Sequence, residues 1–458
     1  MDQKIIDKIK EIVDPKYVLT TAMELLLYSY DASVDSHKPD VVVLPSSTEE
    51  VSKIMKLCYE NNISVLGRGS GTNLSGGTIP TRGGVILHFS RMNNILDVDL
   101  DNRTVTVEPG IFTLDLQNFI ASKGLEYVPD PASQKVSTIG GNVCEDSGGP
   151  HCLKYGTTTN HIRGLEIVLN DGTIVNTGGK AQDHPGYDIT GIVTGAEGTF
   201  AIVTKIVLNL MKPAETTNTI VVVYDTIVDA ANTVSAIIAN GIIPACLEMM
   251  DNTVMRAVDA ALKMGYPLDA AGILIIELDG MSEGLKEKTA QVVEICKKNN
   301  AREVKVPKDA AERVAMWAGR KGAFGAMGQI RPSYLVCDGT VPRTKLPEIL
   351  AIVDKVSKEF NLPIGNVFHA GDGNLHPLIL FDERDADQKQ RTLAASSKIL
   401  KACADVGGTV SGEHGVGLEK LKEVTFICNK DDVLFLKKLK LTFDPTDIVN
   451  PDKMIPAA

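Results

Sequence analysis

The first part of the chain predicts a strand, a helix and a second strand. Asp40–Leu44 is a short apolar run, and Ser47-x-x-Glu50 has the form of a helix capping box. Val51–Glu60 follows with helical periodicity, and Ile63–Leu66 is a second apolar run that leads directly into a glycine-rich loop. Further apolar patterns predict strands at Gly84–Phe89 and Thr104–Glu108 and a helix at Thr113–Ser122.

From about residue 217 a pattern of strand, helix and strand repeats. The predicted units are Thr219–Tyr224, Ile227–Ala239 and Pro244–Met250, then Ile273–Leu278, Glu283–Asn299 and Glu303–Val306, then Tyr334–Val341, Leu346–Glu359 and Ile364–Phe368. Such units predict an α+β domain in which helices cover one face of a sheet. The change of texture places a domain boundary near Lys212-Pro213.

Composition narrows the class of protein. The 458 residues exceed the roughly 250–300 at which a single core stops growing, so several domains are expected. The formal net charge of −11 argues against a nucleic-acid partner. Apolar runs end far short of the ~18 residues of a membrane-spanning helix, and the first residues lack the form of a signal peptide. The eight cysteines form no Cys-x-x-Cys pair, so we expect reduced thiols, mostly in the core, in a cytoplasmic protein without an iron–sulfur cluster of its own.

Two stretches are rich in small residues. Gly67–Gly77 holds five glycines in eleven residues after a predicted strand, and such a loop is able to cradle a diphosphate or to form an ordinary surface turn. It matches neither a P-loop nor a Rossmann fingerprint, because no Lys follows and Pro80 prevents a good helix. A second run of glycine, serine and threonine extends over residues 129–158. Because glycine is costly in a packed core, a ligand approached by backbone explains this run better.

A third constellation contains two of the eight histidines. His369 and His376 flank a Gly-Asp-Gly-Asn turn, so they are expected to face each other across adjoining strands. Glu413-His414 lies farther along the chain, within Ser411-Gly-Glu-His-Gly415. Imidazoles with a carboxylate are standard ligands for Zn²⁺, with Fe²⁺ or Mn²⁺ as alternatives. The competing interpretation is that these histidines only complete hydrogen bonds.

Taken together, these motifs resemble a known flavoprotein superfamily. The glycine loop, Pro129-Asp-Pro-Ala-Ser133, Thr138-Ile-Gly-Gly-Asn142, Gly186-Tyr-Asp-Ile-Thr-Gly191 and Gly195-Ala-Glu-Gly-Thr199 resemble, in that order, the flavin-binding domain of the vanillyl-alcohol oxidase/p-cresol methylhydroxylase superfamily. His-x-Gly-Asp-Gly-Asn-x-His followed by Gly-Glu-His-Gly looks like its 2-hydroxy-acid branch. That branch contains D-lactate dehydrogenases, including subunits of electron-transfer-flavoprotein complexes, D-2-hydroxyglutarate dehydrogenases and the flavin subunit of glycolate oxidase.

The resemblance implies an α+β fold class: a two-subdomain FAD-binding domain plus a cap domain with an antiparallel sheet covered by helices. The implied domains are residues 1–214 for FAD, 215–406 for the substrate and cap, and 407–458 as a C-terminal segment that returns to the FAD domain. Position by position, it implies FAD contacts at Gly67, Arg68, Gly69, Ser70, Gly71, Thr72, Asn73, Gly76, Pro129, Gly140, Gly141, Asn142, Gly148, Glu197, Gly198 and Ile202. Relatives with covalent flavin usually carry a histidine in the first loop, and Arg68-Gly69-Ser70 has none, so noncovalent FAD is expected.

The resemblance also assigns roles in the reaction. It implies His369, His376 and Glu413 as metal ligands, His414 as the catalytic base and Arg320 as the residue that receives the substrate carboxylate. This assignment agrees with elementary chemistry. A cation lowers the pKa of a hydroxyl, an imidazole is able to take its proton near neutral pH, and a guanidinium binds a carboxylate through paired hydrogen bonds. Alternatives are that Arg320 is a solvated surface residue and that Arg331 or Arg343 takes its role.

The predicted activity is that of an FAD-dependent dehydrogenase that oxidises a short D-2-hydroxy acid. In the hydroxyglutarate branch a lysine lies a few residues before the position of Asp338, whereas Tyr334–Cys337 is apolar here, which favours D-lactate or glycolate. The reduced flavin must then pass its electrons to a partner, for which electron-transfer flavoprotein is expected.

Other activities compete with this prediction. They are the flavin subunit of glycolate oxidase, an alkyl-dihydroxyacetone-phosphate synthase-like transferase, a metal hydrolase without flavin, and a noncatalytic FAD-binding subunit.

Overall fold

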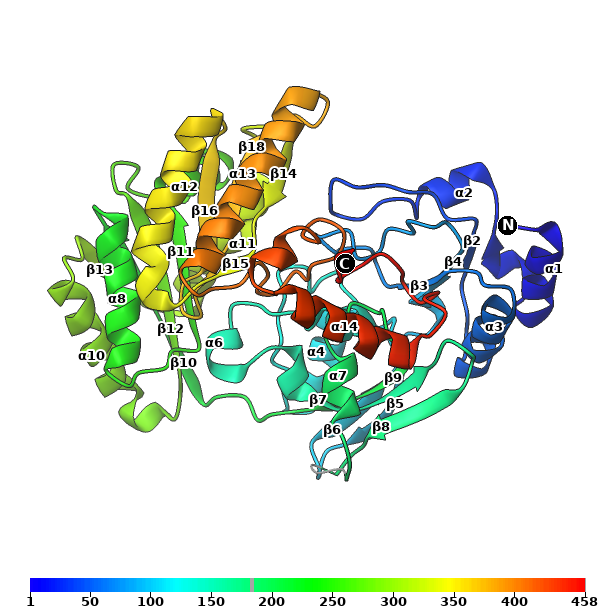
Figure 1. Cartoon of the computed structure of the whole chain (residues 1–458). Helices are drawn as coiled ribbons and strands as arrows, with labels where there is room; N and C mark the ends of the chain where they lie inside the picture. Colours follow the sequence, from blue (N-terminus) through cyan, green and yellow to red (C-terminus); the bar gives the residue numbers. More distant parts are fainter. Residues whose placement is uncertain (182–184, 458) are drawn as a thin grey trace. The chain divides into compact units, whose positions relative to one another are not determined.

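The chain folds into two compact units. The computed structural model describes residues 1–181 and 185–457, shown in Figure 1. The first unit comprises Met1–Gly148, Gly156–Pro213 and Glu413–Ala458, and the second comprises Gly149–Tyr155 and Ala214–Gly412. Three separate stretches of chain therefore build the first unit.

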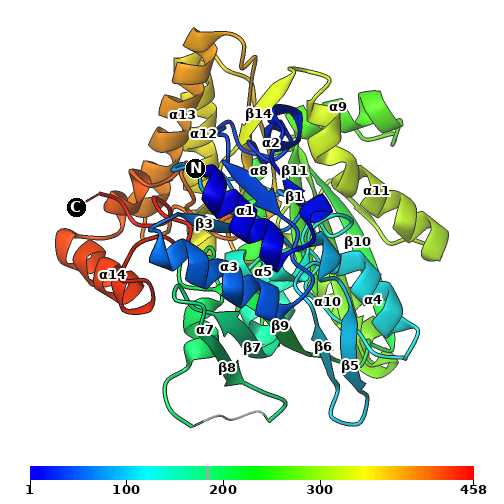
Figure 2. The same cartoon turned by 90° about the vertical axis from the view of Figure 1, so that its right-hand side faces the viewer.

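The first unit begins with a four-stranded sheet of order β1-β2-β4-β3. Its strands are β1 (Val18–Leu19), β2 (Val41–Val43), β4 (Val85–His88) and β3 (Val65–Arg68), of which β2 and β3 run parallel to β4. Helices α1 (Gln3–Ile12) and α3 (Thr48–Glu60) lie side by side, as Figure 2 shows, and bury their apolar faces in the same core as the sheet.

The predicted capping box before α3 forms only in part. The hydroxyl of Ser47 accepts a hydrogen bond from the N–H of Glu50 at 3.2 Å, as predicted. The carboxylate of Glu50 instead accepts from the N–H of Ser46 at 2.7 Å. The N-terminus of the helix is therefore capped, with one hydrogen bond moved back by one residue.

A second, five-stranded antiparallel sheet completes the first unit, with the order β5-β6-β9-β7-β8. Its strands are β5 (Ile95–Asp99), β6 (Thr104–Val107), β9 (Ile202–Asn209), β7 (Ile162–Val168) and β8 (Ile174–Gly178). Helices α4 (Thr113–Ala121) and α5 (Ile139–Glu145) share its core. The C-terminal helix α14 (Lys430–Phe443) packs against this core through Phe443, whose ring stacks on that of Phe200 with 4.8 Å between the ring centres. The two sheets give this unit two subdomains, as expected.

The second unit is built on a nine-stranded sheet whose main path is β13-β10-β12-β11-β16-β17-β15. The strands are β10 (Thr216–Tyr224), β11 (Cys246–Asp251), β12 (Gly272–Gly280), β13 (Glu303–Lys305), β14 (Ser333–Val336), β15 (Gly339–Thr340), β16 (Ile364–His369), β17 (Asn374–Leu375) and β18 (Pro377–Phe381). Every pairing between them is antiparallel. The predicted fold class, α+β with an antiparallel sheet covered by helices, is confirmed.

Helices cover both faces of this sheet, so the prediction of one covered face was wrong. Figure 1 shows α8 (Ile227–Ala239) and α12 (Leu346–Phe360) side by side, and α10 (Ser282–Lys298) packs with α8 against β10 and β12. The helices α9 (Asn252–Leu262) and α11 (Ala310–Met327), which the periodicity did not reveal, pack on the opposite face. Side chains that alternate along each strand are therefore buried on both sides.

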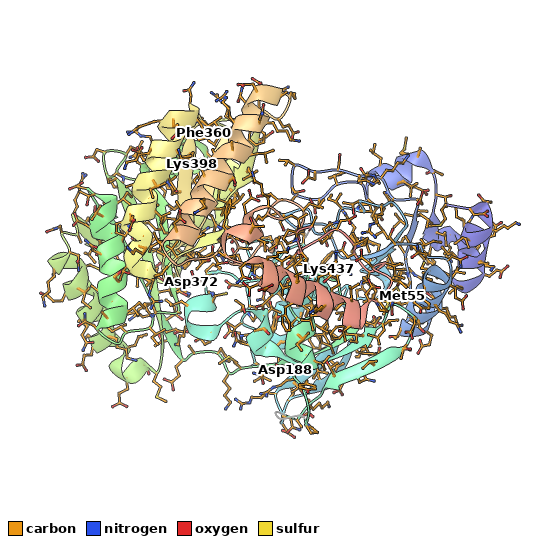
Figure 3. All side chains as sticks on the ribbon, in the orientation of Figure 1. Met55, Asp188, Phe360, Asp372, Lys398 and Lys437 are labelled. Carbon is orange, nitrogen blue, oxygen red and sulfur yellow. The ribbon has the colours of Figure 1, made fainter. Side chains whose placement is uncertain are left out.

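The last long helix of the second unit packs on a neighbouring helix. Helix α13 (Ala386–Asp405) packs against α12, and Figure 3 shows Lys398 beside Phe360, with its ammonium group 6.0 Å from the centre of the ring. All eight cysteines are free thiols, and five of them are buried. Within the described ranges, no helix combines the length and apolarity that crossing a lipid bilayer requires.

Candidate active site

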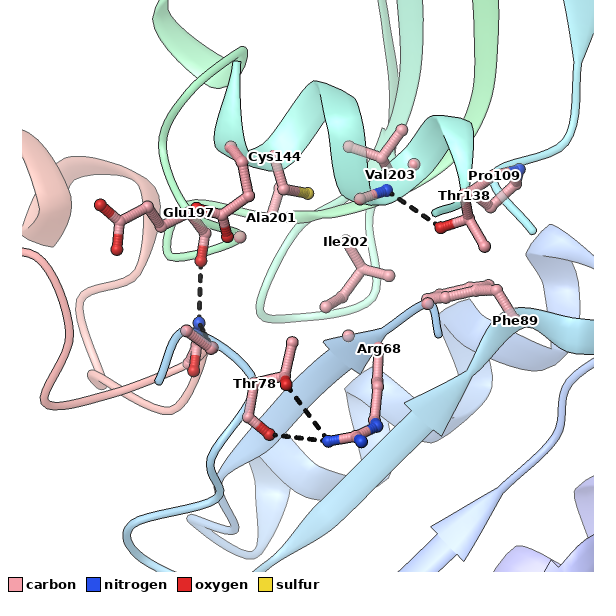
Figure 4. Close-up of a pocket in the computed structure, with 18 residues that line it drawn as sticks. Arg68, Thr78, Phe89, Pro109, Thr138, Cys144, Glu197, Ala201, Ile202 and Val203 are labelled. Carbon is pink, nitrogen blue, oxygen red and sulfur yellow. Dashed lines mark hydrogen bonds between the residues drawn. The ribbon is translucent and has the colours of Figure 1, made fainter. Parts of the chain in front are cut away.

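A pocket opens between the two sheets of the first unit. The space between its walls, including its opening to solvent, is about 550 Å³. Figure 4 shows it with Glu197 at one side and Phe89 at the other. The predicted FAD residues that line it are Gly67, Arg68, Gly69, Gly140, Gly141, Glu197, Gly198 and Ile202.

Other predicted FAD residues do not line this pocket. They are Ser70, Gly71, Thr72, Asn73, Gly76, Pro129, Asn142 and Gly148. The structure gives two of them other contacts. The buried amide of Asn142 donates to Thr113 Oγ1 at 2.8 Å, and the carbonyl of Pro129 accepts from Gln117 Nε2 at 3.0 Å.

Backbone approaches the pocket closely because its glycines lack side chains. A Cβ atom on Gly69 would lie 2.2 Å from Thr138 Oγ1, and one on Gly140 would lie 2.5 Å from Pro109 Cβ. Because real Cβ atoms do not come so close to their neighbours, neither position accepts a larger residue without movement. These two glycines therefore let the backbone pack closely against Thr138 and Pro109 in the wall of the pocket.

The polar side chains of the first loop mostly hold the loop itself. Arg68 is buried, and its guanidinium donates to the carbonyls of Tyr30 and Thr78 at 2.7 and 3.3 Å. Asn73 Oδ1 accepts from the N–H of Gly77 at 2.7 Å, and the hydroxyl of Ser75 donates to the carbonyl of His414 at 2.9 Å. The glycine loop thus fixes the backbone of the predicted catalytic base, 339 residues farther along the chain.

Two buried carboxyl groups lie together at the Glu197 end of the pocket. Glu197 accepts hydrogen bonds from the N–H groups of Val416 and Gly417 at 2.6 and 2.7 Å. Glu145 was not predicted; a Cβ on Gly415 would lie 2.5 Å from its Oε2 atom and 2.9 Å from Glu197 Oε1. Burial and the adjacent charge of Glu197 raise the pKa of Glu145 well above its usual range.

The second unit contains the predicted histidine pair. His369 ends β16 and pairs with Asn374 of β17, and the ring of His376 lies 5.2 Å from that of His369 at 88°. Both residues are buried, and His376 Nδ1 lies 3.3 Å from the carbonyl oxygen of Cys337. The prediction that the two imidazoles face each other across the turn is confirmed.

Arg320 is buried, and this result excludes the solvated surface arginine as an interpretation. Its Nε and Nη2 atoms lie 2.7 and 2.6 Å from Glu248 Oε2, and the other oxygen of the same carboxylate lies 2.7 Å from His369 Nδ1. Burial raises the pKa of Glu248, but His369 and Arg320 outweigh that effect and lower it, so the carboxylate is ionised. No motif in the sequence pointed to Glu248, which is one acidic residue in an apolar strand.

A fourth buried acid, Asp338, forms hydrogen bonds with the residues just before Glu413. Asp338 accepts from the hydroxyl of Ser411 at 2.6 Å and from the N–H of Gly412 at 3.0 Å. A Cβ on Gly412 would lie 2.3 Å from Thr340 Oγ1, so this position also requires glycine. Gly412 ends the second unit, and Glu413 and His414 begin the last stretch of the first. The complete ligand set of His369, His376 and Glu413 stays a prediction.

Comparison with known proteins defines the class to which this fold and these motifs belong. Residues 39–178 match an FAD binding domain, and residues 213–454 match the C-terminal domain of FAD linked oxidases. The chain belongs to the FAD-linked oxidase family, so the predicted family and its FAD cofactor are confirmed.

Relatives with assigned activities cover almost the whole chain. Glycolate oxidase subunit GlcD of Escherichia coli K12 is 41% identical over 449 residues, 98% of this chain and 90% of the relative. D-lactate dehydrogenase of Anaerostipes hadrus is 31% identical over 98% of this chain and 97% of the relative. These are FAD-linked oxidoreductases of the glycolate oxidase and D-lactate dehydrogenase type, and this chain is of the same type.

Solved structures show the same fold at low identity. Substrate-bound p-cresol methylhydroxylase matches with a TM-score of 0.83 at 18% identity, covering 99% of this chain and 97% of that one. An alkyldihydroxyacetonephosphate synthase matches with a TM-score of 0.79 at 19% identity, covering 98% and 86%. At such identities the likeness concerns the fold alone.

Proposed function

We propose that this protein oxidises a short D-2-hydroxy acid, D-lactate above all, to the 2-oxo acid. One observation supports this proposal most directly: in a chain of the FAD-linked oxidase family, a single buried carboxylate contacts both Arg320 and His369. The first is the predicted partner of a substrate carboxylate, and the second is a predicted metal ligand. Their common partner supports an active site in this part of the second unit.

Each residue has a defined task in this proposal. Bound FAD, held without a covalent bond, supplies the acceptor for the hydride from the substrate carbon. A divalent cation on His369, His376 and Glu413, Zn²⁺ with Fe²⁺ or Mn²⁺ as alternatives, would supply positive charge beside the hydroxyl. Arg320 orients the substrate by binding its carboxylate. His414 accepts the hydroxyl proton, because an imidazole exchanges protons near neutral pH.

The apolar character of β14 supports a small monocarboxylate. Tyr334 and Leu335 occupy this strand, and Leu335 is buried, so β14 offers no cation for a second carboxylate. Glycolate is the second candidate, because the relatives of about 41% identity are glycolate oxidase subunits. Their similarity covers the same residues as that of the D-lactate dehydrogenases, so substrate choice must be measured.

An anaerobic spectrum of the yellow protein tests the activity. We expect D-lactate to bleach the flavin band, L-lactate and D-2-hydroxyglutarate to have little effect, and a chelator to prevent the bleaching. If glycolate bleaches the flavin faster than D-lactate does, glycolate is the preferred substrate and the proposal of D-lactate is refuted. A yellow protein bleached by none of these acids would refute hydroxy-acid oxidation and favour a transferase or a noncatalytic subunit.

The electron acceptor needs a separate test. We propose that a second protein, an electron-transfer flavoprotein, reoxidises the reduced flavin. Stopped-flow mixing of the D-lactate-reduced protein with such a flavoprotein should return the yellow band within the time of turnover. Reoxidation only by a quinone or by oxygen would refute this partner.

A further inference from the structure

The residue at the centre of this inference, Glu248, lies in the middle of the sheet of the second unit. It belongs to β11, where the register places it opposite His369 of β16 on one side and Ile275 of β12 on the other. Residues directly opposite each other in antiparallel strands have adjacent side chains on the same face. The pairing of the two strands therefore places the side chain of His369 beside that of Glu248. Glu248 is 0% exposed.

Each oxygen of this carboxylate serves a different partner. Oε1 lies 2.7 Å from His369 Nδ1, and Oε2 accepts from Nε of Arg320 at 2.7 Å and lies 2.6 Å from its Nη2. Because the carboxylate is paired with the guanidinium of Arg320, it is an acceptor, and its contact with His369 places the imidazole proton on Nδ1. That tautomer leaves the lone pair on Nε2, the atom that would then bind a metal ion.

The contact with Glu248 occupies one edge of the Arg320 guanidinium and leaves the other edge for the substrate. The hydrogen bonds to Glu248 use Nε and Nη2, which leaves the Nη1 side as the edge for a second acceptor. A substrate carboxylate bound at that edge would meet a guanidinium that cannot rotate, because its other edge is tied to the sheet. Preorganisation of this kind lowers the conformational entropy lost on binding.

We propose that Glu248 is the positioning residue that fixes both the metal-facing nitrogen of His369 and the substrate-facing edge of Arg320. This inference rests on the proposed function, because it takes from it the roles of those two residues. The inference goes beyond those two roles in one respect: the carboxylate of Glu248 couples the binding of the metal ion to the binding of the substrate carboxylate.

Glu277 supplies a matched control on the same face of the same sheet. It is also buried, and it accepts from Arg313 and Trp317, which lie on the same helix α11 as Arg320. None of its partners is a predicted ligand of metal or substrate. Loss of Glu277 should therefore disturb packing and stability in a similar way without affecting the site.

The decisive variant is Glu248→Gln, which keeps the size of the side chain. If the amide oxygen faces Arg320, the amide N–H group faces His369 Nδ1 and drives the imidazole proton to Nε2. If the amide is turned over, its N–H group faces the N–H groups of Arg320. Neither orientation satisfies both partners. Glu248→Asp keeps the charge and should restore part of both functions.

The test combines Zn²⁺ binding by the metal-depleted protein with the kinetics of D-lactate. Loss of such an indirect ligand partner typically costs 10–100-fold in metal affinity. We therefore expect Glu248→Gln to weaken Zn²⁺ binding about 10–100-fold and to raise the KM for D-lactate, Glu248→Asp to recover part of each, and Glu277→Gln to change neither. Wild-type Zn²⁺ affinity and KM in Glu248→Gln, or equal losses in Glu277→Gln, would overturn the proposal.

A third measurement separates this inference from the proposed function. ¹⁵N spectra of histidine-labelled wild-type protein, with the signal of His369 assigned by its absence in His369→Gln, report the tautomer without any reaction. A proton on Nδ1 supports the role of Glu248 even if no hydroxy acid reduces the flavin, a result that would refute only the function. A proton on Nε2 in the wild type would refute the positioning role even if D-lactate is oxidised.

Discussion

The imidazole of His414 extends from a backbone that the first loop holds in place. Ser75 and Asn73 both donate to the carbonyl oxygen of this residue, at 2.9 and 3.4 Å. Substitution of the ring therefore leaves these two hydrogen bonds to the backbone intact. We expect His414→Asn to retain FAD and to slow reduction of the flavin by D-lactate at least ~100-fold, the usual contribution of a general base.

Rapid mixing under anaerobic conditions measures this effect directly. The exposed His37 gives the control, since the hydrogen bond that it forms with a described residue runs from its backbone N–H to the carbonyl of Ser29 and does not involve the ring. His37→Asn should reduce its flavin at the wild-type rate. A His414→Asn protein that also reacts at that rate would remove this residue from the role of base.

At the scale of single residues, the sequence predicted those parts of the site that recur as motifs. The turn between His369 and His376 was predictable because its glycines and its spacing fix a hairpin. Glu248 and Glu145 were not predictable, because each is one acidic residue whose partners come from distant parts of the chain. Asn73 was predicted to contact FAD, and that contact stays a prediction; the structure shows its amide oxygen accepting from the N–H of Gly77 within the loop.

Among the elements, helix α11 shows why hydrophobic periodicity fails. Arg313, Trp317 and Arg320 follow one another at helical spacing along α11 and face the buried carboxylates of Glu277 and Glu248. Charged residues therefore occupy positions that an amphipathic helix would fill with apolar ones. The sequence analysis therefore did not predict α11, and for that reason it did not predict that helices cover the second face of the sheet.

Two glycines of α11 should respond in opposite ways to alanine. A Cβ on Gly319 would lie 1.9 Å from the hydroxyl of Tyr266, whereas a Cβ on the exposed Gly325 meets nothing within 4 Å. Overpacking costs ~1–3 kcal/mol, and alanine in an open helix position gains roughly 0.5–1 kcal/mol. Gly319→Ala should therefore destabilise the second unit and Gly325→Ala should stabilise it.

Urea unfolding followed by the fluorescence of Trp317, the single tryptophan of the chain, measures both changes. Tyr266→Phe in the Gly319→Ala protein removes the clashing hydroxyl and should recover part of the loss. Equal midpoints for Gly319→Ala and Gly325→Ala would show that Tyr266 moves aside without cost.

The Glu277 cluster should give the second unit a defined dependence on pH. Burial raises the pKa of Glu277, but hydrogen bonds from His151 and Arg313 outweigh it and lower the pKa from 4.5 to about 2. A lowered pKa in the folded state stabilises the protein above pH 4.5, and that stability is lost as pH falls toward 2. From pH 7 to pH 4 the loss from this group should be about 0.8 kcal/mol, and by pH 3 about 2 kcal/mol.

Comparison with Glu277→Gln isolates this contribution, because glutamine does not titrate. The difference in unfolding free energy between wild type and variant, from Trp317 fluorescence, should shrink by those amounts as the pH falls. A difference that stays constant from pH 7 to pH 3 would contradict the lowered pKa.

On the scale of the whole molecule, the last residues of the chain complete the first unit. The N–H of Val65 in β3 donates to the carbonyl of Ile448 at 2.7 Å, and the N–H of Asn450 donates back to the carbonyl of Val65 at 2.8 Å. The C-terminal stretch thus extends the edge of the first sheet by a parallel bridge. Local patterning could not predict this pairing, which joins residues almost 400 positions apart.

Asn450 connects the C-terminal stretch with the pocket that the predicted FAD residues line. Its side-chain amide donates to the carbonyls of Gly77 and Glu197 at 3.0 and 2.8 Å, and all three residues line the pocket. Asn450→Ala would leave both buried carbonyls without this donor, at a cost of roughly 1–3 kcal/mol. We expect the loss of this donor in the wall of the pocket also to weaken FAD binding about tenfold, which corresponds to 1.4 kcal/mol of binding free energy.

Titration of the flavin-free protein with FAD, followed by quenching of flavin fluorescence, gives the dissociation constant. Asn102→Ala is the matched control, because Asn102 is exposed in a turn of the same unit and its amide donates to the nearby Asp99. The control should bind FAD as the wild type does. If Asn450→Ala does so too, the two carbonyls do not need this donor to shape the pocket, and the C-terminal stretch contributes to folding of the first unit without contributing to its affinity for FAD.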